Sequence, residues 1–316
     1  MESVRKLKYL LKTLQLENFT ADLSTVLKEF PLLTTNSFIK RIQKGTIDDP
    51  LLKQILPSIQ ELQLTPSFTN DPLNEIKYNP LPGLLHKYKS KALILLTNSC
   101  AINCRFCFRK KFPYTNNRIT STNWKQILKY LSAHRNIKEI ILSGGDPLIL
   151  NNGTLLQYCL DLEKIQHIDT LRIHSRIPIV LPSRLKPSLI KVLTATRLKP
   201  VLVTHCNHPN EIDSEVSTAI SKFSGNNIIL LNQSVLLKNI NDDAEILIEL
   251  SKKLFAIGIL PYYLHMHDKV SGTYHFYVPI SKAKKLMQQL AEELPGYLVP
   301  KLVKEVPNRP AKCVLY

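Results

Sequence analysis

Cys100-Ala-Ile-Asn-Cys104-Arg-Phe-Cys107 places three cysteines in one short segment at C-x3-C-x2-C spacing. Three thiolates in such a run can each bind one iron of a [4Fe–4S] cluster. The next cysteine in the chain is Cys159, so no fourth thiolate follows nearby. The fourth iron would keep an open position for another ligand, as the metal does in catalytic zinc sites. We therefore expect Cys100, Cys104 and Cys107 to hold a cluster that can bind a further molecule.

Two other uses of these cysteines are less well supported. A zinc site would need a further ligand such as histidine, and no histidine lies close after Cys107. A disulfide with a free thiol would suit a secreted chain, but charges interrupt the apolar residues of the N-terminal stretch MESVRKLKYLLKTLQ, which is unlike a signal peptide. The other cysteines show no ligand spacing, so we expect Cys159, Cys206 and Cys313 to be small buried hydrophobic residues.

The composition is typical of a soluble globular protein that can bury a large core. The chain has 316 residues, of which 44% are hydrophobic and 21% charged, and no apolar run reaches the roughly 18 residues needed to span a bilayer. Few cysteines and an oxygen-sensitive cluster favour the reducing cytoplasm. The net charge of +17 raises the alternative of a nucleic-acid-binding module. The basic residues are dispersed, however, so a lysine-rich solvated surface is the preferred interpretation.

The pattern changes near residue 90. Before it, apolar residues at helical spacing (Val4, Leu7, Leu10, Leu11 and Leu14) are followed by short segments broken by proline. We therefore expect residues 1–90 to form a mainly helical extension that wraps the main domain, residues 91–316.

The main domain alternates short apolar runs with helical stretches. Strands that are apolar throughout and separated by helices are typical of a parallel sheet covered on both faces. Six such units predict an α/β fold, a partial (β/α)6 barrel with a short C-terminal tail. The expected strands are Ala92–Thr97, Glu139–Ser143, Leu171–His174, Val201–Thr204, Ile228–Leu231 and Ile259–Leu264, and the expected helices lie near 122–135, 154–166, 187–197, 213–223 and 242–257.

Each expected strand ends in polar residues. The first leads into the cysteine segment, and the others lead into groups of histidine, serine, asparagine or aspartate. Parallel barrels place their active sites at these carboxyl ends of the strands. The groups are Ser143-Gly144-Gly145-Asp146, His174-Ser175-Arg176, His205-Cys206-Asn207-His208, Asn232-Gln233 and His265-Met266-His267-Asp268.

The cysteine spacing resembles that of the radical S-adenosylmethionine (SAM) enzymes. Longer segments resemble the lysine 2,3-aminomutases within that superfamily, and most of all the short bacterial branch that acts on elongation factor P. That branch is indicated by Cys107-Phe108-Arg109, Pro113-Tyr114 and Tyr262-Tyr263-Leu264-His265. The segments that carry the wider resemblance are 71–73, 82–88, 143–148, 175–182, 204–211, 232–237 and 296–302.

The resemblance implies three cofactors: a [4Fe–4S] cluster, SAM and pyridoxal 5′-phosphate. Ser143, Gly144, Gly145 and Asp146 resemble the segment that contacts the amino group of SAM, and the glycines would let the backbone approach a ligand closely. His205 and Gln233 match further SAM-contacting positions of the family.

Pyridoxal phosphate in this family is held as a Schiff base on a lysine near the C-terminus. Lys312 stands at that position, although the glycines before it and the Thr-Pro after it are missing here. Lys87 matches an arginine that binds the phosphate, an anion that needs cations or backbone donors. Lys91 and Arg176 are weaker candidates for the same role.

The resemblance also implies how the substrate is held. Arg109 matches the arginine that binds the substrate carboxylate, for which its planar fork is suited. Asp268 and Glu305 match two acids that bind the distant ammonium. The implied reaction converts L-α-lysine to (R)-β-lysine by radical 1,2-amino migration.

The expected partners follow from that reaction. They are L-lysine, a one-electron donor such as flavodoxin, and a separate ligase that attaches β-lysine to elongation factor P. The alternatives are an aminomutase for another amino acid, such as glutamate, and a non-catalytic iron–sulfur module that binds nucleic acid. The altered tail around Lys312 adds a third, an aminomutase that has lost its activity.

Overall fold

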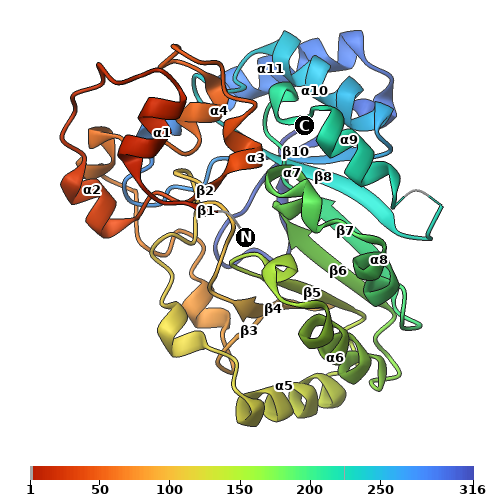
Figure 1. Ribbon diagram of the computed structural model, residues 1–316. Helices are drawn as coiled ribbons and strands as arrows, with labels where there is room; N and C mark the ends of the chain where they lie inside the picture. Colours follow the sequence, from red (N-terminus) through yellow and green to blue (C-terminus); the bar gives the residue numbers. More distant parts are fainter. Residues whose placement is uncertain (1–2, 224) are drawn as a thin grey trace.

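In the computed structural model, which describes residues 3–223 and 225–316, one nine-stranded sheet dominates the fold (Figure 1). Its centre is six parallel strands that coincide with the six predicted apolar runs. Four of the strands contain the whole predicted run, and the other two, β8 and β9, begin one residue later than predicted. These strands confirm the predicted α/β class. They are β4 (Lys91–Thr97), β5 (Glu139–Gly144), β6 (Thr170–Ser175), β7 (Lys199–Thr204), β8 (Ile229–Leu236) and β9 (Leu260–Met266).

A helix follows every parallel strand, and together these helices run round the outside of the strands (Figure 1). The five predicted helices are present, with α8 shorter than expected and followed by turns. A sixth, α11, was not predicted. The helices are α5 (Ser121–Ala133), α6 (Asn152–Glu163), α8 (Pro187–Leu193), α9 (Ser214–Ser221), α10 (Ala244–Ala256) and α11 (Ile280–Glu293); the single-turn α7 (Ile177–Val180) precedes α8.

Local sequence explains where these helices begin and which face is buried. Thr120 caps α5, because its hydroxyl accepts from the backbone N–H of Asn123, whose side chain accepts from the N–H of Thr120 in return. Asp243 caps α10 in the same sense, accepting from two N–H groups of the first turn. On α11, the buried residues recur at helical spacing and form one apolar stripe; they are Ala283, Leu286, Met287 and Leu290.

Three further strands extend the sheet at its two ends. At one end β3 (Leu84–Tyr88) pairs antiparallel with β4. At the other, β10 (Lys301–Lys304) pairs parallel with β9, and β11 (Cys313–Val314) pairs antiparallel with β10. The strand order is therefore β11-β10-β9-β8-β7-β6-β5-β4-β3, which makes the sheet open and not a closed barrel.

The open sheet is strongly curled. Lys87 on β3 donates from Nζ to Oε1 of Glu305, just after β10, at 2.6 Å. Seven strand-to-strand steps separate β3 from β10, and at about 4.8 Å per step a flat sheet would place these strands roughly 34 Å apart. The short ion pair therefore shows that the two ends of the sheet come together, as a partial barrel requires.

The N-terminal segment lies against the inner side of the curl (Figure 1). Its apolar residues, including Leu10, Leu14 and Leu51, share one core with Ile94 of β4. The division of the chain at residue 90 stays a prediction. β3 lies before residue 90 and belongs to the sheet of the main domain. The elements of the segment are β1 (Ser3–Val4), α1 (Leu7–Thr13), α2 (Ser24–Glu29), β2 (Thr34–Thr35), α3 (Asn36–Ile39) and α4 (Pro50–Lys53), followed by 3₁₀ turns at Ile59–Leu62 and Glu75–Tyr78.

Among the described residues, none of the helices combines the length and the apolar character required to traverse a bilayer.

Candidate active site

A cavity of about 500 Å³ opens at the carboxyl ends of the parallel strands, inside the curl of the sheet. Five of the six parallel strands contribute residues to its wall, and His205 joins the wall directly after the sixth, β7, as expected for the active site of a parallel barrel. Every residue predicted to bind a cofactor or the substrate lines this cavity. They are Lys87, Cys100, Cys104, Cys107, Arg109, Ser143, Gly144, Gly145, Asp146, His205, Gln233, Asp268, Glu305 and Lys312, together with Lys91 and Arg176.

A second hollow, of about 640 Å³, lies on the surface between α3 and the segments that precede α6 and α8. None of the predicted residues lines it, and no thiol or histidine is among its lining residues. The convergence of thiols, imidazoles and carboxylates therefore marks the cavity at the strand ends as the candidate active site.

The cysteine segment leaves β4 and is held in place by the buried Arg105 between two of its cysteines. The guanidinium donates twice to the carboxylate of Glu61, at 2.8 and 2.6 Å, and once to the carbonyl of Phe30 at 2.8 Å. Both partners belong to the N-terminal segment. A bidentate buried pair of this kind fixes orientation as well as position, so the extension holds the cysteine segment at the cavity.

The three thiols fit an iron–sulfur cluster better than a single ion. No three His, Cys, Asp or Glu side chains among the described residues are placed to hold one metal ion. In a cluster each sulfur binds a different iron, so the ligands lie farther apart. Burial, followed by the negative charge of neighbouring groups, raises the pKa of the Cys100 thiol and raises that of Cys107 to about 11. Bound iron would supply the positive charge that these buried thiolates need.

The remaining cysteines differ in exposure. Cys159 and Cys206 are buried, as expected, but Cys313 is only partly buried. Its position on β11, a two-residue strand at the edge of the sheet, leaves one side of the chain open, so the expectation of burial was wrong for this residue.

The glycine pair after β5 is required by packing within the protein. A Cβ on Gly144 would lie 2.4 Å from the carbonyl oxygen of Thr97, and one on Gly145 would lie 2.2 Å from that of Ser99. Gly144 also has a positive φ of 118°. The glycines thus let the segment after β5 lie directly against the segment that leads to the cysteines, in addition to lining the cavity.

Asp146 fastens the ends of β5 and β6 together. Its carboxylate accepts from the hydroxyl of Ser175 and the backbone N–H of Arg176, both at 2.7 Å, and from the N–H groups of Ile177 and Leu148 at 3.1 Å. Burial raises the pKa of this carboxyl even though all four hydrogen bonds lower it. With its oxygens occupied in this way, Asp146 can orient the cavity wall.

Four histidines that line the cavity have ring nitrogens without a hydrogen-bond partner among the described residues. These are Nε2 of His174, His205 and His265 and both ring nitrogens of His267. Burial, with the charge of Arg176 next, lowers the pKa of His205 to about 3, so its ring is neutral. A neutral imidazole offers one donor and one acceptor, and buried polar atoms without partners are costly. A polar cofactor with its own donors and acceptors, such as SAM, fits this wall.

Glu305 is the centre of a charged group that joins both ends of the sheet. It accepts from Lys87 at 2.6 Å, from Lys312 at 2.5 Å and from the hydroxyl of Tyr88. Burial opposes ionisation, but Lys312 and the hydrogen bonds outweigh it and hold the pKa of Glu305 at about 2. Two lysines at the cavity, one predicted to bind a phosphate and one to form a covalent bond, fit pyridoxal phosphate.

Arg109 and Asp268 line the cavity in contrasting states. Arg109 donates twice to Glu75, at 2.8 and 2.6 Å, and once to the hydroxyl of Ser143 at 3.1 Å. The carboxylate of Asp268, in contrast, accepts no hydrogen bond from any residue that the structure describes. Burial raises the pKa of Asp268 to about 7, although Lys312 lowers it.

Sequence reasoning missed two residues of the site. Glu75 holds Arg109 from the N-terminal segment, 34 positions away in the chain. Tyr88 contacts Glu305 across the gap between the two ends of the sheet. Neither lies at the end of a predicted strand, so no spacing signal pointed to them.

The central part of the chain matches a known superfamily. Residues 94–204 match the sequence model described as "Radical SAM superfamily". A radical SAM methyltransferase from Sphaerobacter thermophilus is similar in structure, with 15% identity over 70% of this chain and 68% of that chain, but its TM-score of 0.49 is too low to carry an argument.

Curated relatives extend the match to almost the whole chain. The L-lysine 2,3-aminomutase of Escherichia coli (strain K12) is 46% identical over 91% of this chain and 84% of the relative. That of Haemophilus influenzae is 44% identical over 96% and 90%, and that of Clostridium subterminale is 34% identical over 98% and 74%. These matches confirm the predicted resemblance, the isomerase class and the three cofactors of such enzymes. The chain belongs to the L-lysine 2,3-aminomutase family of radical SAM enzymes.

Proposed function

We propose that this protein converts L-α-lysine to (R)-β-lysine by moving the amino group from C2 to C3. One observation carries the proposal: a guanidinium, Arg109, and two carboxylates, Asp268 and Glu305, line the same cavity as the three cysteines and Lys312. Lysine has a carboxylate at one end and an ammonium at the other, which is the complement of that arrangement.

Arg109 would bind the substrate carboxylate. Glu75 and Ser143 hold its guanidinium in one orientation, and a planar fork gives directional hydrogen bonds to a carboxylate. Burial opposes the charged form, but Glu75 raises the pKa of Arg109, so the cation persists at every working pH.

Asp268 and Glu305 would bind the ammonium of the substrate side chain. Both line the cavity, and a pair of acids there opposes a glutamate substrate, whose second carboxylate would meet like charge at close range. Lysine is therefore the preferred substrate over glutamate.

The cofactors supply the reactive chemistry and the chain positions it. When bound, the cluster and SAM supply the radical that removes hydrogen from C3, and pyridoxal phosphate supplies the conjugated system that lets the nitrogen migrate. Cys100, Cys104 and Cys107 would hold the cluster, and His205, Gln233 and the segment Ser143–Asp146 would face SAM. Lys312 would anchor pyridoxal phosphate through Nζ, with Lys87 near its phosphate.

The biological role follows from the resemblance to the short bacterial branch. We propose that the β-lysine is passed to a ligase that attaches it to elongation factor P, that flavodoxin or a similar donor reduces the cluster, and that the enzyme works in the cytoplasm. The motifs Cys107-Phe108-Arg109 and Tyr262-Tyr263-Leu264-His265 support this branch.

The direct test is conversion of lysine by the anaerobically reconstituted, reduced protein. We expect (R)-β-lysine only when SAM and pyridoxal phosphate are both present, and no β-glutamate from glutamate. Borohydride should trap the cofactor on the parent protein and leave none on Lys312→Ala. Absence of β-lysine from a preparation with full iron and trapped cofactor would overturn the proposal, and β-glutamate as the main product would replace it with the glutamate alternative.

A further inference from the structure

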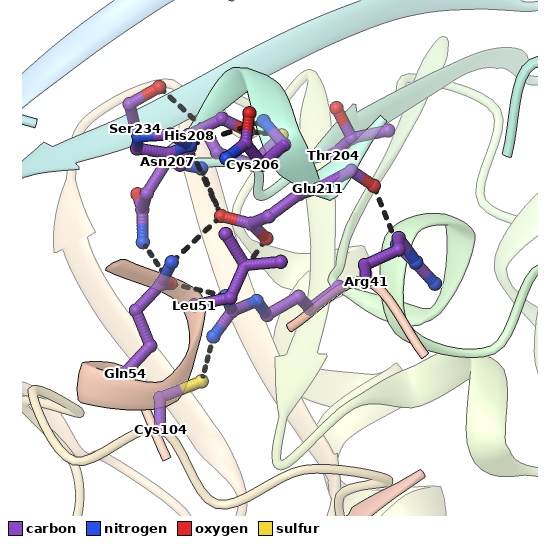
Figure 2. A network of polar contacts seen from close by, with 12 residues as sticks. Arg41, Leu51, Gln54, Cys104, Thr204, Cys206, Asn207, His208, Glu211 and Ser234 are labelled. Atoms are coloured by element: carbon purple, nitrogen blue, oxygen red, sulfur yellow. Dashed lines mark hydrogen bonds and ion pairs between the residues drawn. The ribbon is translucent and has the colours of Figure 1, made fainter. Parts of the chain in front are cut away.

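A buried polar group lies directly behind Cys104. Of its members only Arg176 was considered above, as a weaker candidate for the phosphate, and the structure places its guanidinium against Cys104 instead. The members lie directly after α4, directly after β6 and in the segment after β7 (Figure 2). They are Gln54, Arg176, Asn207 and Glu211, each no more than 5% exposed.

Arg176 connects this group to the cysteine segment. Its Nη1 donates to Sγ of Cys104 at 2.6 Å, while Nη2 donates to Gln54 at 2.5 Å and to Glu211 at 3.0 Å. The rings of Phe38 and Phe106 lie 5.4 and 5.5 Å from the guanidinium carbon. The cation is thus enclosed by aromatic rings and directed at a single sulfur.

Glu211 holds Arg176 in that position. Besides the guanidinium, its carboxylate accepts from the amide of Gln54 at 3.0 Å and from the backbone N–H groups of Asn207 and His208 at 2.9 and 3.1 Å. The backbone N–H of Arg176 is itself fixed by Asp146 at 2.7 Å. The donor to Cys104 is therefore preorganised by the protein.

A fixed cation beside a cluster sulfur has a definite electrostatic consequence. Reduction adds negative charge to the cluster, and hydrogen bonds to its sulfurs and nearby charge set its reduction potential. Guanidinium keeps its charge at every working pH, and at a buried position the interaction is weakly screened.

We propose that Arg176 is a positioning residue that raises the reduction potential of the cluster through Cys104, and that the buried carboxylate of Glu211 offsets part of this effect. The inference rests on the proposed assignment of Cys100, Cys104 and Cys107 as cluster ligands. A role confined to joining α4 to the strands would leave the potential unchanged.

The test is a redox titration of the reconstituted cluster followed by electron paramagnetic resonance, without substrate. Arg176→Gln should make the cluster harder to reduce by about tenfold, a shift of about 59 mV to more negative potential for one electron. Glu211→Gln removes the opposing charge and should shift the potential the other way. Opposite shifts are the signature of charge, because loss of packing would not reverse sign between the two variants.

Arg41→Gln is the matched control. Arg41 lies next to this group and donates to the backbone carbonyl of Glu211 at 2.5 Å (Figure 2), but its described hydrogen-bond and ion-pair partners are Ser37, Glu211 and Asp213, not Cys100, Cys104 or Cys107. It should destabilise the fold while leaving the potential of the cluster at the parent value.

The iron content and the thermal unfolding of each variant show whether it still folds and holds a complete cluster, and only the potential of such a variant tests the proposal. Equal potentials for the parent and Arg176→Gln, at full iron content, would overturn the proposal. If Arg176→Gln loses its iron, Glu211→Gln decides, and an unshifted or lowered potential there overturns it. A parent protein without iron would overturn both this proposal and the cysteine assignment, whereas a normal cluster in a protein inactive on lysine would count against the proposed function alone.

Discussion

Nζ of Lys312 lies 2.5 Å from Oε2 of Glu305, and the other oxygen of that carboxylate accepts from Lys87 at 2.6 Å. The lysine proposed to anchor pyridoxal phosphate and the acid proposed to bind the substrate ammonium are thus paired with each other. Covalent attachment at Nζ would withdraw the Lys312 ammonium and leave Glu305 with one cation fewer. The incoming ammonium of lysine can then take the vacated side of the carboxylate.

Glu305→Gln should therefore weaken the use of lysine more than the attachment of the cofactor. A hydrogen bond to a charged group contributes about 1.5–3 kcal/mol, which corresponds to roughly a 10- to 100-fold loss in kcat/KM, carried mainly by KM. Steady-state kinetics over a range of lysine concentrations checks this. Glu293→Gln, at an exposed position on α11, is the control and should behave as the parent; an unchanged KM in Glu305→Gln would remove this acid from substrate binding.

The pH dependence of kcat/KM should report Asp268. Its pKa is raised to about 7 by burial, and the Lys312 ammonium that lowers it is lost on covalent attachment, so the inflection should lie at about 7 or higher. Only the ionised carboxylate attracts the substrate ammonium, so kcat/KM should rise with pH through this range.

Asp268→Asn should abolish the rise and leave a lower, flatter profile. The stability of the parent protein should fall as the pH rises, whereas kcat/KM rises. A carboxyl whose pKa is raised in the folded state binds more protons there than in the unfolded state, so the free energy of unfolding should decrease from about pH 4 to about pH 7. The decrease should be smaller in Asp268→Asn. A steep rise of kcat/KM that survives in the variant would assign the titration to another group.

Replacing Cys100, Cys104 or Cys107 singly by alanine should remove most of the iron and all of the activity, because each thiolate binds its own iron. Iron analysis and the visible absorbance of the anaerobically reconstituted protein measure this. Cys159→Ala, on the buried face of α6 and outside the cavity lining, should keep full iron content. Retention of a complete cluster in any one of the three variants would exclude that cysteine as a ligand.

The buried pair between Arg105 and Glu61 should matter greatly for stability. Removing one partner of a buried ion pair typically costs about 3–5 kcal/mol, and here Glu61→Gln leaves both Arg105 and Lys110 without their carboxylate. Urea unfolding should show the loss. Glu29→Gln breaks the exposed pair with Lys111 and should cost less than about 1 kcal/mol; equal costs for the two variants would contradict the role given to Arg105.

The centre of the fold could be predicted because its strands are apolar on both faces. The run Glu139–Gly144 shows this, and the polar groups that follow such runs pointed to the rim of the sheet. The outer strands could not be predicted in the same way. β3 carries His86 and Lys87, and β11 is two residues long, so neither has the apolar pattern of a buried strand. α11 does carry a helical apolar stripe, so its sequence contains the pattern that predicts a helix.

The candidate site was predicted as far as its residues could be matched to strand ends or to a known family. The pairings within it could not be, because they join distant segments. Glu75 to Arg109, Glu61 to Arg105 and Gln54 to Arg176 all reach from the N-terminal segment to the cavity wall or to the cysteine segment beside it. Nothing in the spacing of single polar residues in a helical and irregular segment indicates which arginine they will contact.

The two margins of the curled sheet have one further consequence. No backbone ladder joins them in the described part of the chain; the side chains of Lys87 and Tyr88 reach across to Glu305, and Lys87 also reaches the carbonyl of Val306. A seam of this kind can part and close again while every strand keeps its neighbours. The cavity can therefore open for the exchange of substrate and product while the sheet around it stays folded.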